Sequence, residues 1–332
     1  LNFKNIIKQM IKKNLNIIHI GMPKVATTTL QINVFPIIAK KIKRKLVLQK
    51  DLNKSLGKSN LSNHYFKIKK FNKKNCLISF ESLISIDGNP FFYEKNFQIL
   101  KKTFGFNSHI IIILKNPLSF LNSIYLQNIN NLNLKREKDF FLYKDEYFNF
   151  IKNNKKIYSG AHWCLEKFNQ KKLINMYKKS FRKVTILKID ALKDPNIICN
   201  LFDLTLNDSK KVISIISKKK LNKSPGVYIV NLAFFLNRIL KFFNTNLLKL
   251  YNFQIKAHKY IDKSIITNFN FLRRSLKLLF FLLNFRFIYQ QIILKIIKDK
   301  DYKVNFKKFK YFNVNRELNF YNNLPKVTYF NN

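Results

Sequence analysis

The stretch LNIIHIGMPKVATTTLQ, residues 15–31, decides the fold that this sequence predicts. Its first six residues, 15–20, are largely apolar and do not alternate, which predicts a β-strand that is buried on both faces. Gly21 and Pro23 follow and predict a turn, and the threonines that start at Thr27 can open a helix. The stretch therefore predicts a strand, a turn and a helix in succession, which is the unit from which parallel sheets are built.

Other segments extend this pattern along the chain. Segments of helical period separate further apolar runs, and these runs predict strands at KLVLQ (45–49), CLISF (76–80), HIIIIL (109–114) and VTILKI (184–189). After about residue 206 the strand signal stops, and apolar residues recur at helical spacing. We therefore expect an α/β core over residues 1–205, with a central parallel sheet flanked by helices, and a mostly helical C-terminal part over residues 206–332.

The charge of the chain has two interpretations. The 332 residues carry a formal charge of +46, from 63 Lys and Arg against 17 Asp and Glu, which by itself favours nucleic acid or an anionic membrane as partner. The excess is spread along the whole chain, however, and only 6 residues are Gly, a composition typical of proteins from AT-rich genomes. We therefore expect no specific nucleic-acid partner.

Cysteines and apolar runs limit the class of protein further. Cys76, Cys164 and Cys199 are scattered and lack the CxxC spacing, which predicts neither a disulfide framework nor a zinc site and fits a reducing cytosol. No apolar run reaches the roughly 18 residues that a membrane span requires. A cytoplasmic location is therefore expected. Basic amphipathic segments, at 229–250 and 271–298, are expected to pack onto the core, with a peripheral contact with the inner face of the membrane as the alternative.

The turn after the first strand has the chemistry of an anion cradle. Backbone N–H groups at the start of a helix hold phosphate oxygens, and Lys24 adds a full positive charge beside them. The Walker A pattern of nucleotide-binding proteins places its Lys directly after a Gly and directly before Ser or Thr. Here Lys24 precedes Thr27 by three positions, which disfavours a GTPase or kinase of that class.

The order Gly-x-Pro-Lys-x-(small)-Thr-Thr-x-Leu-Gln resembles the 5′-phosphosulfate loop of sulfotransferases that use 3′-phosphoadenosine 5′-phosphosulfate (PAPS). The resemblance implies a P-loop-like sulfotransferase fold in which Lys24 stabilises the charge that develops on the leaving phosphate. It also implies that the loop binds the donor through Gly21, Pro23, Lys24, Val25, Ala26, Thr27 and Thr28. In that family the position of Ala26 is usually Gly.

A second segment, HIIIILKNPLSFLNSIYLQ (109–127), strengthens the resemblance. Sulfotransferases resembling this chain carry a basic residue at the end of that strand and a serine eight positions later, and the two bind the 3′-phosphate of the nucleotide. Lys115 and Ser123 have this spacing, although the family usually has Arg at the first position. A strand's carboxyl end and the first turns of the next helix both face the crevice where such sheets bind ligands.

A general base must remove the proton of the acceptor hydroxyl. Members of the wider family use His or Glu for this step, and Glu81, at the end of the strand 76–80, is the residue we expect here, with a plain surface carboxylate as the alternative. His162 and His64 are further candidates, whereas His109 lies inside a predicted buried strand and is expected to be a core residue. No metal is implied.

The resemblance therefore predicts a PAPS-dependent sulfotransferase that acts on a hydroxyl of a glycan or glycolipid. The carbohydrate acceptor rests on analogy with bacterial relatives alone. Two alternatives stay open. One is a basic nucleic-acid-binding protein, and the other is a non-catalytic relative. The second is suggested by Ala26, Lys115 and Asp190, which stand where the family usually has Gly, Arg and Glu, the last in a segment that VTILKIDALKDP (184–195) resembles.

Overall fold

The computed structural model describes residues 15–25, 27–48, 75–85, 88–130, 134–153, 162–218, 226–242 and 300–332. The chain divides into two compact units. The first unit comprises Leu1–Leu121, Phe141–Leu221 and Phe306–Asn332, and the second comprises Asn122–Phe140 and Asn222–Asn305.

A six-stranded sheet forms the centre of the first unit. Its order is β2-β3-β1-β4-β7-β8, and the first five of these strands run parallel. They are β1 (Asn16–His19), β2 (Lys45–Leu48), β3 (Cys76–Ser79), β4 (Ser108–Leu114) and β7 (Lys183–Lys188). Each coincides with a strand that the sequence predicts, so the prediction of an α/β fold with a largely parallel sheet is confirmed.

The sixth strand, β8 (Val327–Asn331), was not predicted. It pairs antiparallel with β7 at the edge of the sheet, so the strands do not stop near residue 206. Its residues are only half-buried or exposed. An edge strand covered on one side has no continuous apolar run, and this weak pattern is why the sequence did not reveal it.

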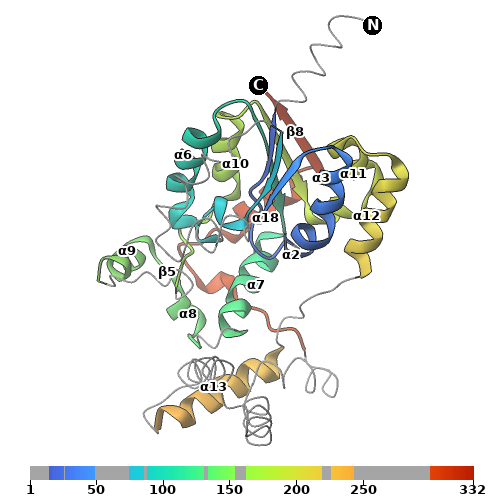
Figure 1. The fold of residues 1–332 in the computed structure, drawn as a ribbon. Coiled ribbons are helices and arrows are strands. Elements are labelled where there is room, and N and C mark those ends of the chain that lie inside the picture. The colour runs from blue at the N-terminus through green and yellow to red at the C-terminus, as the bar shows by residue number, and fades with distance from the viewer. Residues whose placement is uncertain are drawn as a thin grey trace, which may run out of the picture. The chain divides into compact units, whose positions relative to one another are not determined.

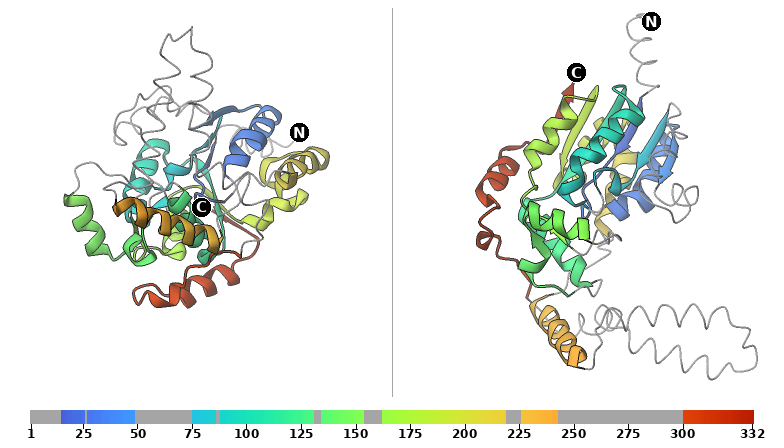
Figure 2. Two further views of the ribbon diagram at one scale, coloured as in Figure 1. Left: turned by 90° about the horizontal axis from the view of Figure 1, so that it is seen from below. Right: turned by 90° about the vertical axis from the view of Figure 1, so that its left-hand side faces the viewer.

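Helices cover both faces of this sheet (Figure 1). In that view α6 (Tyr93–Phe104) and α10 (Gln170–Lys178) lie on one side, while α3 (Phe35–Lys41), α11 (Pro195–Phe202) and α12 (Leu206–Lys218) lie on the other. Figure 2 shows α6 and α10 running side by side across their face in its right-hand view. The unit also contains α2 (Thr27–Thr29), the π-helix η1 (Leu30–Val34), η3 (Glu81–Leu83), η5 (Pro90–Phe92), α9 (Lys144–Asn153), η7 (Ile189–Lys193), η9 (Phe306–Lys308) and α18 (Val314–Asn323).

The core of the first unit has two parts, the apolar residues of the strands and an aromatic cluster around Trp163. All seven residues of β4 are buried, as expected for a central parallel strand. Trp163 lies in β6 (Trp163–Cys164), which pairs with β5 (Phe141–Leu142) in a separate two-stranded sheet. Its ring packs against those of Phe120, Phe141 and Phe168, and all four side chains are buried.

The second unit contains α8 (Glu137–Phe140), α13 (Val227–Phe242) and most of α7 (Pro117–Asn130), which begins in the first unit. Tyr302 stacks on Tyr125 of α7, and its hydroxyl donates to Glu137 at 2.8 Å. The amphipathic segment at 271–298 lies outside the described residues. Among the helices that the structure does describe, none is both long and apolar enough to cross a bilayer.

Candidate functional site

The order of the strands identifies one place in the sheet where ligands are expected. After β1 the chain passes to the β2 edge, whereas after β4 it passes to β7 on the opposite side. β1 and β4 are neighbours, so their carboxyl ends form the topological switch point, where open parallel sheets bind ligands. Lys24 follows β1 and Lys115 follows β4 directly, so both predicted phosphate-binding lysines come from this point.

The loop after β1 has left-handed backbone at two positions. Gly21 has φ +34° and Lys24 has φ +65°, and a left-handed lysine is uncommon because its Cβ crowds the backbone. Alternation of left-handed and right-handed residues turns successive N–H groups toward one point, and such concavities bind anions. Strained backbone of this kind is found preferentially at functional sites.

Close packing fixes the two ends of the loop. A Cβ on Gly21 would lie 2.8 Å from the His19 ring and 2.9 Å from the Thr27 methyl group, so only glycine fits there. A Cβ on Gly88 would lie 2.4 Å from the Pro23 ring. The segment after β3 therefore supports the loop through Pro23. No local pattern predicts this contact, because Gly88 lies 65 positions away in the chain.

The ammonium groups of Lys24 and Lys115 act on each other. Burial lowers the pKa of Lys115, and the positive charge of Lys24 lowers it further. Two cations are held near each other at the switch point although they repel, and a bound anion would remove that repulsion. This arrangement is the strongest sign of an anion site in the described part of the chain.

Glu81 lies beside the loop, as the sequence predicts for a base. It begins η3, is half-buried, and its carboxylate accepts a hydrogen bond from the Thr27 hydroxyl. Helix α2 begins at Thr27, as predicted, and Thr28 next to it is exposed. The Thr27 hydroxyl thus donates its hydrogen to Glu81, so it cannot at the same time donate to an anion in the loop.

The other predicted site residues have different outcomes. Val25 has no exposed surface, so it is not open to direct contact with a ligand. Ala26 lies outside the described residues, and so does His64. Ser123 lies on α7 in the second unit, and its place in one site with Lys24 stays a prediction.

Two of the histidines, His109 and His162, make packing and hydrogen-bond contacts inside the fold. His109 is buried and its Nε2 lies 2.8 Å from the Thr185 hydroxyl, while burial lowers its pKa to about 3. The prediction that His109 is a core residue is therefore confirmed. His162 packs its ring on Phe150, and its backbone carbonyl accepts a hydrogen bond from the buried side chain of Asn89.

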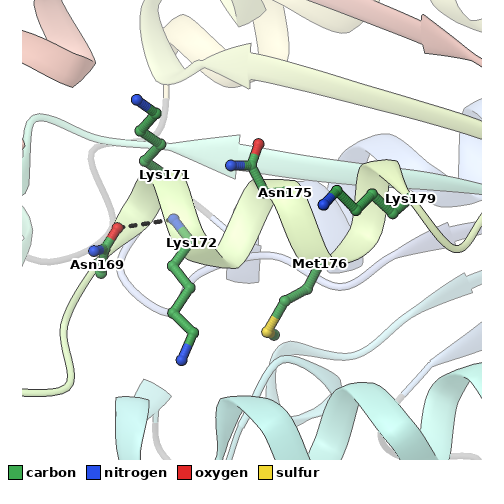
Figure 3. A pocket seen from close by; sticks show the side chains of 6 residues that line it. All are labelled: Asn169, Lys171, Lys172, Asn175, Met176 and Lys179. Atoms are coloured by element: carbon green, nitrogen blue, oxygen red, sulfur yellow. Dashed lines mark hydrogen bonds between the residues drawn. The ribbon is translucent and has the colours of Figure 1, made fainter.

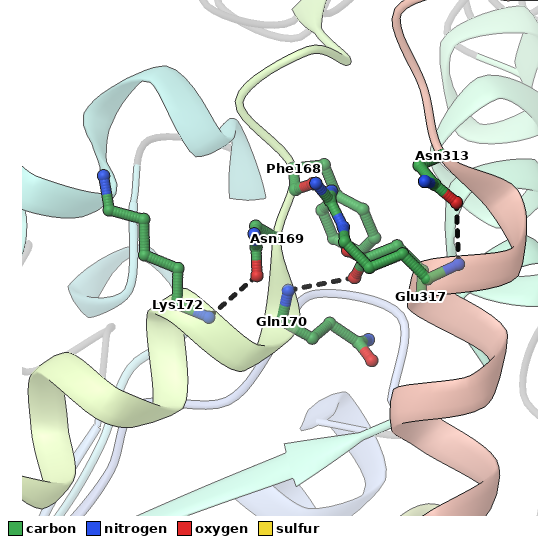
Figure 4. Close-up of polar contacts among 7 residues, drawn as sticks. Phe168, Asn169, Gln170, Lys172, Asn313 and Glu317 are labelled. Carbon is green, nitrogen blue, oxygen red and sulfur yellow. Dashed lines mark hydrogen bonds and ion pairs between the residues drawn. The ribbon is translucent and has the colours of Figure 1, made fainter.

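A buried polar network supports the turn that carries Lys115 (Figure 4). The Gln170 side chain donates to the Lys115 carbonyl at 3.4 Å, and the Gln170 backbone N–H donates to the Glu317 carboxylate at 3.0 Å. Glu317 is 1% exposed, and its carboxylate also accepts from the Arg316 guanidinium at 2.8 Å. Tyr321, one helical turn after Glu317 on α18, receives a hydrogen bond from the Asn116 backbone. The C-terminal helix therefore holds the end of β4, a role that the sequence did not reveal.

Replacing Glu317 with alanine is expected to lower the free energy of unfolding by about 2–4 kcal/mol, because the buried Gln170 N–H and the Arg316 guanidinium lose their acceptor. Denaturant unfolding at neutral pH measures this change. An alanine variant as stable as the wild type would contradict the role of the network.

Glu317→Gln is the matched control, since the amide oxygen can still accept from Gln170. Burial raises the pKa of Glu317 above its ordinary value of 4.5, so the folded chain holds this proton more tightly than the unfolded chain. The stabilisation that the proton provides is present below pH 4.5 and is lost as pH rises through the raised pKa. The Gln variant is expected to lack this part of the pH dependence.

A surface cavity of about 420 Å³ lies elsewhere, on the outer face of α10 (Figure 3). Its lining residues come from this one helix and the residues that cap its two ends, and they are Asn169, Lys171, Lys172, Asn175, Met176 and Lys179. Lys172 also forms an ion pair with Glu94 at 2.6 Å. The cavity is open and solvated, and neither Lys24 nor Lys115 lines it, so it carries no argument about the switch point.

Metal ligands do not gather at any described position. Among the residues that the structure describes, no group of three or more His, Cys, Asp or Glu side chains could hold an ion. Comparison with known proteins adds no further constraint, because no protein-family model, no curated protein and no solved structure matches this chain significantly.

Proposed function

We propose that the chain is a PAPS-dependent sulfotransferase that acts on a hydroxyl group of a carbohydrate acceptor. One observation carries the proposal. The two lysines expected to bind the donor, Lys24 and Lys115, both follow strands of the switch point, and the charge of Lys24 lowers the pKa of Lys115 there. The resemblance of residues 21–31 and 115–123 to the two nucleotide-binding motifs of that family supplies the identity of the anion.

The residues present at the switch point fit such a donor. The left-handed loop and Lys24 suit the 5′-phosphosulfate group, and Lys115 suits the 3′-phosphate, to which Ser123 is added on its spacing in the sequence alone. PAPS would supply an activated sulfuryl group. The oxygen of the acceptor hydroxyl forms a bond to sulfur while the bond between sulfur and the 5′-phosphate breaks, and adenosine 3′,5′-bisphosphate leaves. Lys24 neutralises negative charge beside the loop. Glu81 accepts the proton of the hydroxyl and must be ionised to do so.

Binding of adenosine 3′,5′-bisphosphate, the donor without its sulfuryl group, tests the proposal first. Titration calorimetry is expected to show one site that prefers this nucleotide over AMP and ATP. A chain that binds DNA or RNA tightly, with a steep dependence on salt, and does not prefer the bisphosphate would contradict it. Transfer of ³⁵S from labelled PAPS to a panel of glycans then separates an enzyme from a non-catalytic relative.

A further inference from the structure

His19, the last residue of β1, has one ring nitrogen for which no function is yet assigned. The side chain is completely buried, and its Nδ1 lies 2.8 Å from the Ser79 hydroxyl. Its Nε2 has no hydrogen-bond partner among the described residues. Because burial lowers the pKa of His19 to about 3, the imidazole is neutral and carries a single N–H.

Contacts of Ser79 decide which nitrogen carries that hydrogen. The Gln31 amide nitrogen lies 3.3 Å from both the Ser79 carbonyl and the Ser79 hydroxyl. A carbonyl only accepts, so the amide group of Gln31 faces Ser79 with its donors, and the hydroxyl also accepts from it. Among the described residues His19 Nδ1 is the remaining acceptor for the hydroxyl's own hydrogen, so the hydroxyl donates to Nδ1 and His19 carries its own hydrogen on Nε2.

This buried N–H faces the anion loop. A Cβ on Gly21 would lie 2.9 Å from Nε2, so the ring lies directly against the loop's first residue. Thr27, at the other end of the loop, is close to that same point, since its methyl group would lie 2.9 Å from the same Cβ. A buried donor without an acceptor is costly, so a state in which a group of the loop accepts from Nε2 is favoured.

We infer that His19 is a positioning residue of the anion site, an inference that rests on the proposed function. In the nucleotide-bound state its Nε2–H donates to a backbone carbonyl of loop residues 21–25. The C=O and N–H of a trans peptide point in opposite directions, so a carbonyl held by the imidazole turns the N–H of that peptide outward, toward the 5′-phosphate. His19 has no exposed surface, so it acts through the loop and not by touching the ligand.

Two substitutions separate the ring nitrogens. In His19→Gln the side-chain amide reaches the position of Nε2, whereas in His19→Asn it reaches only the position of Nδ1. We expect His19→Asn to weaken binding of adenosine 3′,5′-bisphosphate about tenfold, the effect of one lost hydrogen bond, and His19→Gln to weaken it less than about threefold. Affinity for adenosine 3′-monophosphate, which lacks the 5′-phosphate, is expected to be the same in both variants.

His109→Asn is the matched control. His109 is also a buried, neutral histidine of the same sheet, but its Nε2 is bonded to Thr185 near the opposite end of β4. This variant is expected to lose stability as the His19 variants do, while its affinity for the bisphosphate equals that of the wild type. A purely structural role of His19 would make His19→Asn and His109→Asn alike in binding.

Long-range ¹H–¹⁵N spectra of the wild type read the tautomer directly and are expected to show His19 protonated at Nε2. Protonation at Nδ1, or bisphosphate binding by His19→Asn as tight as by His109→Asn, would overturn the inference. If the wild type binds the bisphosphate and Lys24→Asn does not, while His19→Asn binds normally, only the inference about His19 fails. A wild type that binds no bisphosphate overturns the proposed function and, with it, this inference.

Discussion

Loss of the Lys24 ammonium is expected to reduce sulfuryl transfer about 100- to 1,000-fold, the effect of removing one charge stabiliser from a developing anion. Lys24 follows β1 at the switch point, and its charge already acts on Lys115 in the free protein. The same loss is expected to weaken binding of adenosine 3′,5′-bisphosphate about 10- to 100-fold, since a hydrogen bond to a charged group is among the stronger ones. Calorimetry and the ³⁵S assay measure the two effects.

A substitution at Lys24 has to suit the left-handed backbone at that position. Lys24 has φ +65°, and asparagine tolerates the left-handed region better than most residues do, so Lys24→Asn removes the charge without adding strain. Lys95→Ala removes one exposed positive charge from α6 and serves as control for the net charge of the chain. If both variants bind the bisphosphate as the wild type does, the anion is not held at the loop.

Replacing Glu81 with glutamine is expected to reduce turnover about 100- to 10,000-fold, the range for loss of a general base. Affinity for the bisphosphate is expected to change less than about threefold, because the amide oxygen can still accept from the Thr27 hydroxyl. Steady-state kinetics on a glycan that the wild type sulfates, together with calorimetry, separate the two quantities.

Glu94→Gln is the corresponding control, because Glu94 is an exposed carboxylate that pairs with Lys172 on the surface. It should leave turnover unchanged. Normal turnover of the Glu81→Gln variant would assign the base to another residue, and His162, whose side chain is half-buried, is then the next residue to test.

The sequence predicts the sheet well because its central strands are buried on both faces. Residues 15–20 and 109–114 are largely apolar and do not alternate, and a short run of this kind between turn signals favours a buried strand. β8 was missed for the opposite reason, since its half-exposed residues lie at the edge of the sheet. Five residues without a buried apolar run are weak evidence for a strand.

The sequence predicted those residues of the candidate site that lie next to a predicted strand. Lys24 and Lys115 follow β1 and β4, so local pattern was enough to find them. Their supports come from distant parts of the chain. Ser79 binds His19 across 60 positions, and Glu317 binds Gln170 across 147, and no local pattern of one sequence reveals such pairs.

A crystal structure of the chain with adenosine 3′,5′-bisphosphate tests the central claim most directly. The claim is that the carboxyl ends of β1 and β4 form one site for a nucleotide with two phosphates. We expect the 5′-phosphate to lie within hydrogen-bonding distance of Lys24 and the backbone N–H groups of the loop, and the 3′-phosphate to lie against Lys115 and Ser123. A nucleotide bound elsewhere, for example against the lysines of α10, would contradict the account.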